Sequence, residues 1–172
     1  NSYLNSNGEQ DKRMETINIG ILGFGVVGAG VASLLLEKKE LLTSRTGAVL
    51  NLKTIADIDT TTDRGIDLKQ TALVNDARKV IEDPQIDIIV ETIGGETIAM
   101  EFIELALENQ KHVVTANKAL LAARGNSLIK LARKNYVDLA FEASCGGCMP
   151  IIKTLRESLV ANDIFSMSGI LN

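Results

Sequence analysis

The sequence is poor in the residues that mark several specialised classes of protein. Its 172 residues include no tryptophan, one histidine, two cysteines and two prolines. Two cysteines and one histidine cannot supply the four ligands of a structural zinc site. No apolar stretch approaches the roughly 20 residues of a membrane-spanning helix, and residues 1–15 lack the apolar centre of a signal peptide. We therefore expect a cytoplasmic protein with no membrane partner.

The sequence also lacks a basic tract. Its formal net charge is −4, and aromatic side chains make up only 3% of the chain. A nucleic-acid partner is therefore not expected. Hydrophobic residues make up 45% and charged residues 23%, which is enough apolar material for the core of one ordinary domain. These proportions favour chemistry on a small molecule.

The most informative motif is the glycine turn Gly23-Phe24-Gly25-Val26-Val27-Gly28. It follows an apolar, β-rich run and precedes a leucine-rich segment of helical character. In such a turn Gly23 permits the tight bend, Gly25 lets backbone approach a pyrophosphate, and Gly28 lets the helix pack on its strand. The helix N-terminus then offers free N–H groups to the anion. We interpret the motif as a dinucleotide-binding site rather than an ordinary turn.

Strand and helix patterns alternate along the rest of the chain. The expected strands are 17–22, 50–57, 86–90, 112–115, 137–141 and 164–171. The expected helices are 27–42, 76–81, 96–109, 127–134 and 150–160, with loops at 43–47 and 59–65. Apolar spacing predicts buried faces formed by Val27, Val31, Leu34, Leu35, Leu41 and Leu42 in the first helix and by Ile98, Phe102, Leu105 and Ala106 in the third. The alternation predicts an α/β fold with a doubly wound parallel sheet of the Rossmann type.

Asp57, at the end of the second predicted strand, is the expected partner of the adenosine ribose. Its negative charge would repel a 2′-phosphate, which favours NAD over NADP. The spacing from Gly23 is longer than the usual ~20 residues, so Asp59 remains a rival for this role. Arg64 could instead serve a 2′-phosphate.

Three further segments end strands at the same edge of the sheet, where open α/β folds bind ligands. They are 91–95, 115–118 and 142–147. In the first, paired glycines let backbone approach the nicotinamide ribose, and in the second a lysine can present a cation to substrate or bound water. The expected contact residues in these two segments are Ile93, Gly94, Thr115, Asn117 and Lys118.

Cys145 and Cys148 form a C-x-x-C pair just before a predicted helix. One alternative function is therefore an NAD-binding redox sensor in which the two thiols form a switchable disulfide. A second is an acylating semialdehyde dehydrogenase with Cys145 as nucleophile, although that chemistry needs a downstream histidine and His112 lies upstream. We favour unreactive thiols and a structural role for His112.

Five segments, taken in order, resemble homoserine dehydrogenase. They are 19–28 (IGILGFGVVG), 91–95 (ETIGG), 114–122 (VTANKALLA), 141–151 (FEASCGGCMPI) and 169–172 (GILN). The resemblance implies an enzyme that interconverts L-homoserine and L-aspartate 4-semialdehyde with NAD or NADP, in the biosynthesis of threonine, methionine and isoleucine. It also implies a homodimer or a higher homo-oligomer.

The resemblance implies roles for particular residues as well. Cofactor contacts would come from Phe24, Val26, Val27, Thr92 and Lys118, and the lysine would support catalysis beside the nicotinamide and the substrate. A structural sodium ion would lie on mostly main-chain oxygens of Glu142, Cys145, Gly147 and Met149. The two cysteines replace residues that are commonly aliphatic or small in the family.

The resemblance covers the nucleotide-binding part of the family only. We expect a polar leader at 1–15, in which Met14 is a possible natural start, and a dinucleotide-binding domain at 16–162. Residues 163–172 would begin a truncated substrate and dimerisation domain. Because the main catalytic residues of the family lie in that domain, we expect the 172-residue chain to be inactive by itself.

Overall fold

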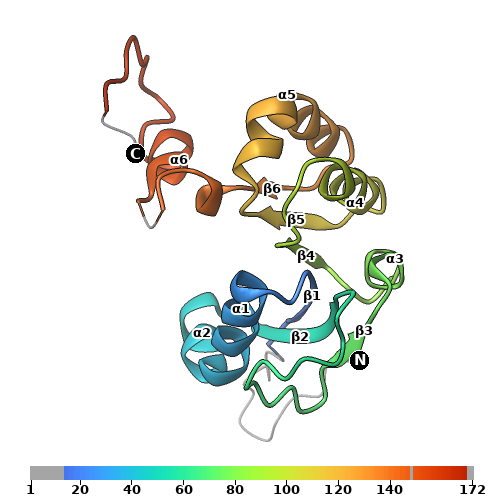
Figure 1. The fold of residues 1–172 in the computed structure, drawn as a ribbon. Coiled ribbons are helices and arrows are strands. Elements are labelled where there is room, and N and C mark those ends of the chain that lie inside the picture. The colour runs from blue at the N-terminus through green and yellow to red at the C-terminus, as the bar shows by residue number, and fades with distance from the viewer. Residues whose placement is uncertain (1–13, 148, 170–172) are drawn as a thin grey trace, which may run out of the picture.

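The computed structural model describes residues 14–147 and 149–169. In these residues six strands form one parallel sheet with the order β3-β2-β1-β4-β5-β6 (Figure 1). They are β1 (Thr16–Leu22), β2 (Val49–Ala56), β3 (Ala72–Val74), β4 (Ile88–Glu91), β5 (His112–Thr115) and β6 (Leu139–Ala140). The predicted α/β fold with a doubly wound parallel sheet is confirmed. The order reverses at β1, which is the topological switch point where such sheets bind ligands.

Helices cover both faces of the sheet. They are α1 (Val26–Glu37), α2 (Lys39–Thr46), α3 (Ala77–Ile81), α4 (Thr97–Glu108), α5 (Lys118–Lys134) and α6 (Ile151–Lys153), which continues as a wider turn over Thr154–Ser158. Helices α1 and α2 lie on one face, and α3, α4 and α5 lie on the other (Figure 1). Side chains of β1 alternate between these faces, because Ile21 packs in the cluster with α1 and Leu22 in the cluster with α3, α4 and α5.

The first crossover is two helices instead of the single helix expected from the sequence. Lys38 leaves helical geometry with φ −105° and ψ 20°, and α2 follows at once. The predicted loop 43–47 is mostly helical, and within it the hydroxyls of Ser44 and Thr46 donate to carbonyls one turn earlier at 2.8 and 2.9 Å. Gly47, in the left-handed region with φ 74°, ends the helix.

The buried faces of α1 and α4 are rotated from the predicted ones. The buried residues are Gly28, Ala32 and Leu35 in α1, and Ala99, Ile103, Ala106 and Leu107 in α4. Val27, Leu34 and Ile98, which the spacing placed in the core, are each more than half exposed. Small residues explain the difference, because Gly28, Ala32 and Ala99 let the helices lie close to their neighbours, and the larger side chains then fall at the rim.

Three larger differences from the prediction concern α5, β3 and the end of the described chain. Helix α5 begins at Lys118 rather than at 127, because the side chain of Asn117 caps it by accepting the N–H of Leu120 at 3.1 Å. Strand β3 was not predicted, since only three residues form it. Over 164–169 the structure has no strand, and the rest of the predicted strand lies outside the described residues, as do residues 1–13 of the expected leader.

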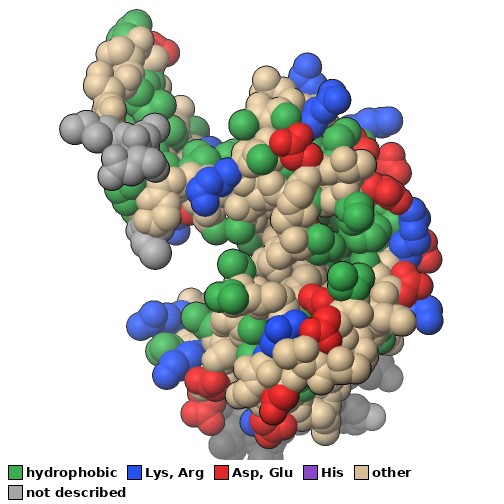
Figure 2. All heavy atoms as spheres, in the orientation of Figure 1, with side chains coloured by type: hydrophobic (Ala, Val, Ile, Leu, Met, Phe, Trp, Pro, Cys, Tyr) green, Lys and Arg blue, Asp and Glu red, His purple; other side chains and the backbone are tan. Residues whose placement is uncertain are grey.

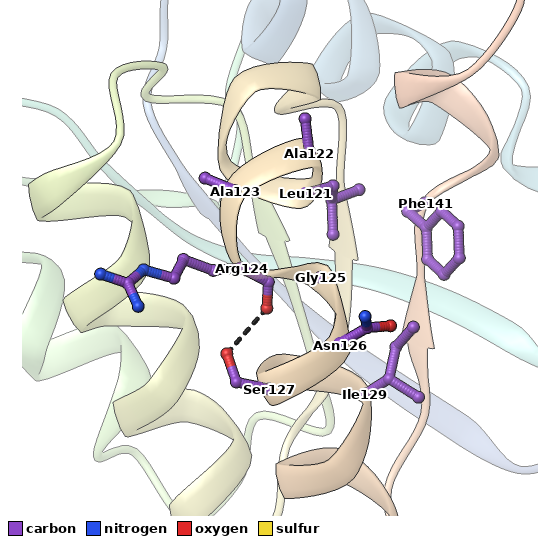
Figure 3. A pocket seen from close by; sticks show the side chains of 9 residues that line it. All are labelled: Leu121, Ala122, Ala123, Arg124, Gly125, Asn126, Ser127, Ile129 and Phe141. Atoms are coloured by element: carbon purple, nitrogen blue, oxygen red, sulfur yellow. Dashed lines mark hydrogen bonds between the residues drawn. The ribbon is translucent and has the colours of Figure 1, made fainter.

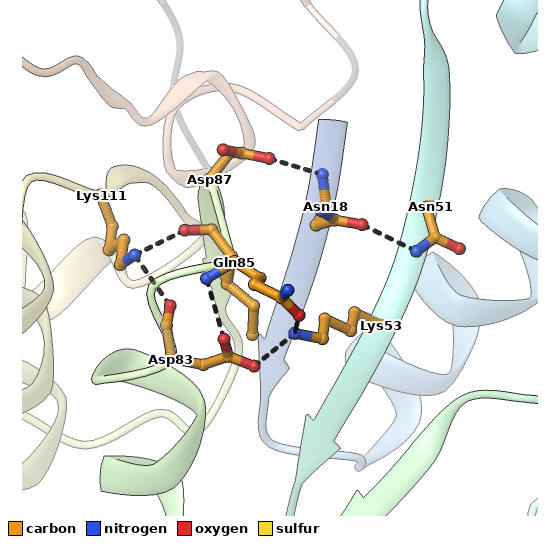
Figure 4. A network of polar contacts seen from close by, with 8 residues as sticks. Asn18, Asn51, Lys53, Asp83, Gln85, Asp87 and Lys111 are labelled. Carbon is orange, nitrogen blue, oxygen red and sulfur yellow. Dashed lines mark hydrogen bonds and ion pairs between the residues drawn. The ribbon is translucent and has the colours of Figure 1, made fainter. Parts of the chain in front are cut away.

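A polar network fixes the amino edge of the sheet (Figure 4). The buried ammonium of Lys111 donates to the carbonyls of Asp83 and Ile86 at 2.9 and 2.7 Å. Lys53 binds the Asp83 carboxylate at 2.6 Å and, with the N–H of Gln85, lowers the pKa of that carboxyl. These contacts pin the loop between α3 and β4 to the strand ends.

None of the helices in 14–147 and 149–169 is long and apolar enough to cross a membrane.

Candidate functional site

Four strands end at the same level on the carboxyl edge of the sheet. Leu22 pairs with Ala56 of β2 on one side and with Glu91 of β4 on the other, and Glu91 pairs in turn with Thr115 of β5. The segments that follow these strands therefore lie in one row. They contain the glycine turn, Asp57, Thr92–Gly95 and Asn117–Lys118, so the structure brings the predicted contact residues together at one edge.

The first and third glycines of the glycine turn have no room for a side chain. Gly23 has φ +94°, and a Cβ there would lie 2.8 Å from the backbone carbon of Thr92. A Cβ on Gly28 would lie 1.9 Å from the carbonyl oxygen of Gly23. The hydroxyl of Thr92 also donates to that oxygen, at 2.8 Å. Tight packing of β1, α1 and the segment after β4 accounts for both glycines.

The second glycine lies in different surroundings. Gly25 caps α1, and a Cβ on it would meet no atom within 4 Å. The first N–H groups of a helix have no acceptor within the helix, and they point out of its N-terminus. Val26 and Val27 beside them are 93% and 55% exposed. The turn therefore offers open space and free donors to an anion, which fits a dinucleotide pyrophosphate.

The side chain of Phe24 does not face this open space. It is 2% exposed and packs with Ile21 and Leu35 in the core cluster of α1. Its backbone N–H donates instead to the carboxylate of Asp57. Any contact of Phe24 with a ligand must therefore come from its backbone.

Asp57 connects the end of β2 to the glycine turn. One carboxylate oxygen accepts the N–H of Phe24, and the other accepts the N–H of Asp59 at 2.8 Å. Asp59 points into its own loop, where hydrogen bonds from Thr62 and then Thr61 lower the pKa of its carboxyl. Of the two rivals from the sequence, Asp57 is the one that contacts the glycine turn.

Arg64 is held by the same loop. Its guanidinium binds the Asp59 carboxylate at 3.2 Å, and its Nε is the one buried side-chain nitrogen or oxygen without a hydrogen-bond partner in the described part of the chain. The arginine therefore lies near the end of β2 but is already paired with a carboxylate.

The segments after β4 and β5 are joined by Glu91, whose side chain the sequence reasoning did not single out. Its carboxylate is buried and accepts hydrogen bonds from Ile93, Gly94 and Thr115. Thr115 is also buried, so its hydroxyl supports the site from below rather than facing a ligand. An acidic residue at the end of an apolar strand was the only signal in the sequence for this arrangement.

Asn117 and Lys118 begin α5 at the edge of the site. The side chain of Asn117 caps the helix and donates to the carbonyl of Gly95, so both of its polar atoms already have partners. The side chain of Lys118 is exposed, and no ion pair involves it within 14–147 and 149–169. Lys118 is therefore the accessible cation of this row.

The segment predicted to hold sodium lies between β6 and α6. The Glu142 side chain accepts the N–H groups of Ile152 and Lys153 at 2.9 and 2.7 Å, which ties the segment to α6. Cys145 is a half-buried thiol 3.6 Å from the Ser144 hydroxyl, and Cys148 lies outside the described residues. In the described residues no group of three or more His, Cys, Asp and Glu side chains could hold a metal ion.

The surface is hollowed between the part that carries α1 and the part that carries α6 (Figure 2). Three depressions can be described by the residues that line them. One of about 380 Å³ lies between α5 and Phe141, with Leu121 and Ile129 turned towards the ring and Arg124 turned away (Figure 3). The others, of about 700 and 490 Å³, lie at the amino edge and beside α6. The glycine turn lines none of these three.

Comparison with known proteins decides the family. A family model described as the NAD-binding domain of homoserine dehydrogenase matches residues 23–142. The chain belongs to the homoserine dehydrogenase family. The resemblance seen in the sequence is therefore confirmed, and the cofactor of this domain is a nicotinamide dinucleotide. The match does not favour the redox sensor or the acylating dehydrogenase.

Individual members of the homoserine dehydrogenase family agree with this assignment. The enzyme from Neisseria gonorrhoeae is 42% identical over 92% of this chain, and the match covers 36% of that relative. A crystal structure of the Thiobacillus denitrificans enzyme has a TM-score of 0.80 and 40% identity, covering 87% of this chain and 34% of that one. A hyperthermophilic archaeal homoserine dehydrogenase in complex with NADPH has a TM-score of 0.69 and 28% identity, covering 85% and 50%. The chain thus spans about a third of the length of the first two relatives.

Proposed function

We propose that this chain binds NAD or NADP as the nucleotide-binding part of a homoserine dehydrogenase, which interconverts L-homoserine and L-aspartate 4-semialdehyde. The observation that carries the proposal is the glycine turn, where Gly25 opens onto free space at the N-terminus of α1. The whole enzyme would act in the biosynthesis of threonine, methionine and isoleucine. We further propose that it is a cytoplasmic homo-oligomer with a small-molecule substrate and neither a nucleic-acid nor a membrane partner.

Each part of the carboxyl edge has a role in this proposal. The first N–H groups of α1 bind the pyrophosphate, and Gly25 leaves room for it. Asp57 accepts hydrogen bonds from the adenosine ribose, and the backbone of Thr92, Ile93 and Gly94 faces the nicotinamide ribose. Lys118 presents its ammonium to the substrate oxygen. The bound cofactor supplies the hydride chemistry, and the protein supplies binding and orientation.

We also propose that sodium binds main-chain oxygens of Glu142, Cys145, Gly147 and Met149. Two features support a curved backbone there. Gly146 and Gly147 have φ of 71° and 34°, and the Glu142 side chain fixes the segment to α6. Oxygen donors suit a hard cation of this kind.

The proposal is tested by separating binding from turnover. We expect the 172-residue chain to bind NAD in a calorimetric titration and to show no turnover of homoserine in an absorbance assay that follows the reduced cofactor. The reason is that the chain spans only 36% of the N. gonorrhoeae relative, while the glycine turn is complete. Failure to bind either NAD or NADP would overturn the proposal, and robust dehydrogenase activity would refute the expected inactivity.

Asp57 gives a prediction about cofactor preference. Its carboxylate should favour NAD over NADP by about 1 to 3 kcal/mol, or roughly fivefold to 150-fold, because it repels a 2′-phosphate. Asp57→Ala should narrow the ratio of the two dissociation constants and weaken both, since the Phe24 N–H also loses its acceptor. Competition titrations with NAD and NADP measure this ratio.

The matched control for that prediction is Asp63→Ala. Asp63 is an exposed carboxylate in the same loop, and it accepts the N–H of Gly65 at 2.8 Å. Its removal changes the net charge by the same amount as Asp57→Ala and should leave the ratio of the NAD and NADP dissociation constants unaltered. A clear NADP preference in the unmodified chain would contradict the role of Asp57 and point to Arg64.

A further inference from the structure

Glu91 makes an unusual set of contacts for a side chain that faces no solvent. It ends β4 and is 1% exposed. One carboxylate oxygen accepts the N–H groups of Ile93 and Gly94 at 2.8 and 3.3 Å, and the other accepts the Thr115 hydroxyl at 2.6 Å. A buried carboxylate is costly unless it is hydrogen-bonded, and here three donors satisfy it. The group therefore holds two backbone segments through one side chain.

The contacts continue from Thr115 into a closed circuit. The Thr115 hydroxyl accepts the N–H of Asn117 at 3.0 Å, and the Asn117 side chain donates to the carbonyl of Gly95. The circuit thus returns to the segment that Glu91 holds directly. Gly94 and Gly95 both lie in the left-handed region, with φ of 77° and 74°. The segment after β4 and the start of α5 are therefore fixed to one another.

The circuit lies on one side of the switch point only. β2 and Asp57 lie on the opposite side of β1 from β4 and β5. In a doubly wound sheet the dinucleotide lies across this point, with the pyrophosphate at the glycine turn. The adenosine half then faces β2, and the nicotinamide half faces the segments that Glu91 connects.

We propose that Glu91 is a positioning residue for the nicotinamide half of the bound cofactor, acting through the backbone of Ile93–Gly95 and through Lys118. This inference rests on the proposed dinucleotide function. Within the described residues, the side chain of Glu91 hydrogen-bonds only to the segment after β4 and to Thr115 at the end of β5. Its loss should therefore disturb one half of the ligand and spare the other. A general scaffold residue would disturb both halves alike.

The test compares two ligands on the 172-residue chain. NAD carries both halves, whereas ADP-ribose lacks the nicotinamide. In Glu91→Gln an amide N–H₂ replaces one of the two carboxylate oxygens, so either the Thr115 hydroxyl or the N–H groups of Ile93 and Gly94 lose their acceptor. The expected result is about tenfold weaker binding of NAD with less than about a twofold change for ADP-ribose, by calorimetric titration of each.

Two further variants keep the test decisive if Glu91→Gln fails to fold. Thr115→Val removes the hydroxyl that joins the segments and should weaken the binding of NAD but not that of ADP-ribose. Thr115→Ser keeps the hydroxyl and should bind NAD like the unmodified chain. The matched control is Asp83→Asn, which alters a hydrogen-bonded carboxylate at the amino edge. It should lower the melting temperature without changing either affinity.

The outcomes separate this inference from the function on which it rests. If the affinities for NAD and ADP-ribose fall in parallel in the Glu91 and Thr115 variants, the circuit is only a scaffold and the inference is wrong. It is equally wrong if neither affinity changes. If the unmodified chain binds neither ligand, the dinucleotide function itself fails.

Discussion

Gly25→Val is expected to abolish dinucleotide binding while the fold remains intact. A Cβ at position 25 would meet no protein atom within 4 Å, so we expect the valine to conflict with the ligand and not with the fold. The branched side chain would occupy the space that the pyrophosphate needs and would keep it away from the N–H groups of α1. We expect binding to weaken by about a hundredfold or more, equivalent to roughly 3 kcal/mol. Calorimetric titration measures the affinity for NAD, and a thermal melt shows whether the fold is intact.

Gly30→Val is the matched control for this result. Gly30 lies in the same helix, and a Cβ on it would likewise meet nothing within 4 Å. It lies one turn further from the N-terminus, so the valine should leave NAD binding unchanged. If Gly25→Val bound NAD as tightly as the unmodified chain, the glycine turn would not be the phosphate site.

Gly28→Ala, in contrast, is expected to destabilise the fold, because the added methyl group conflicts with the protein itself. The added methyl group would lie 1.9 Å from the carbonyl oxygen of Gly23 and 2.9 Å from the Thr92 hydroxyl. The backbone oxygen cannot move without opening the turn between β1 and α1. We expect a loss of about 3 kcal/mol of unfolding free energy, together with weaker NAD binding. Urea denaturation followed by circular dichroism measures the loss.

Gly125→Ala serves as the comparison for stability. Gly125 lies in α5, and a Cβ on it would lie at an ordinary 3.8 and 3.9 Å from side-chain atoms of Leu121. Alanine should therefore be tolerated there and should stabilise the helix slightly, since glycine is a poor helix former. A Gly28→Ala variant as stable as the unmodified chain would contradict the close packing of α1 on β1.

The sequence predicted those parts of the fold that depend on local chemistry. The glycine turn, the apolar run of β1 and the short helix expected at 76–81 each depend on a few neighbouring residues, and each lies within one residue of its expected position. The strand His112–Thr115 was predicted with its observed bounds. Asp57 was also identified as the residue at the end of β2, and the structure places it against the glycine turn.

The missed features depend on residues that are distant in sequence. In the sequence Glu91 is an ordinary acidic residue at the end of a strand, and only its contact with Thr115 of the neighbouring strand β5 reveals its role. The buried side of α4 is set by close approach at Ala99, which apolar spacing underestimates. β3 is too short to give a pattern, and pairing with β2 alone defines it. Such features follow from the assembled sheet and not from local sequence.

The network of Lys53, Asp83 and Lys111 lies at the amino edge, whereas the glycine turn lies at the carboxyl edge. The length of the strands separates the two, and no residue belongs to both. Mutations at the amino edge can therefore lower or raise the free energy of unfolding without altering the residues that contact the ligand at the carboxyl edge. Folding stability and ligand binding can consequently evolve independently of one another in this domain.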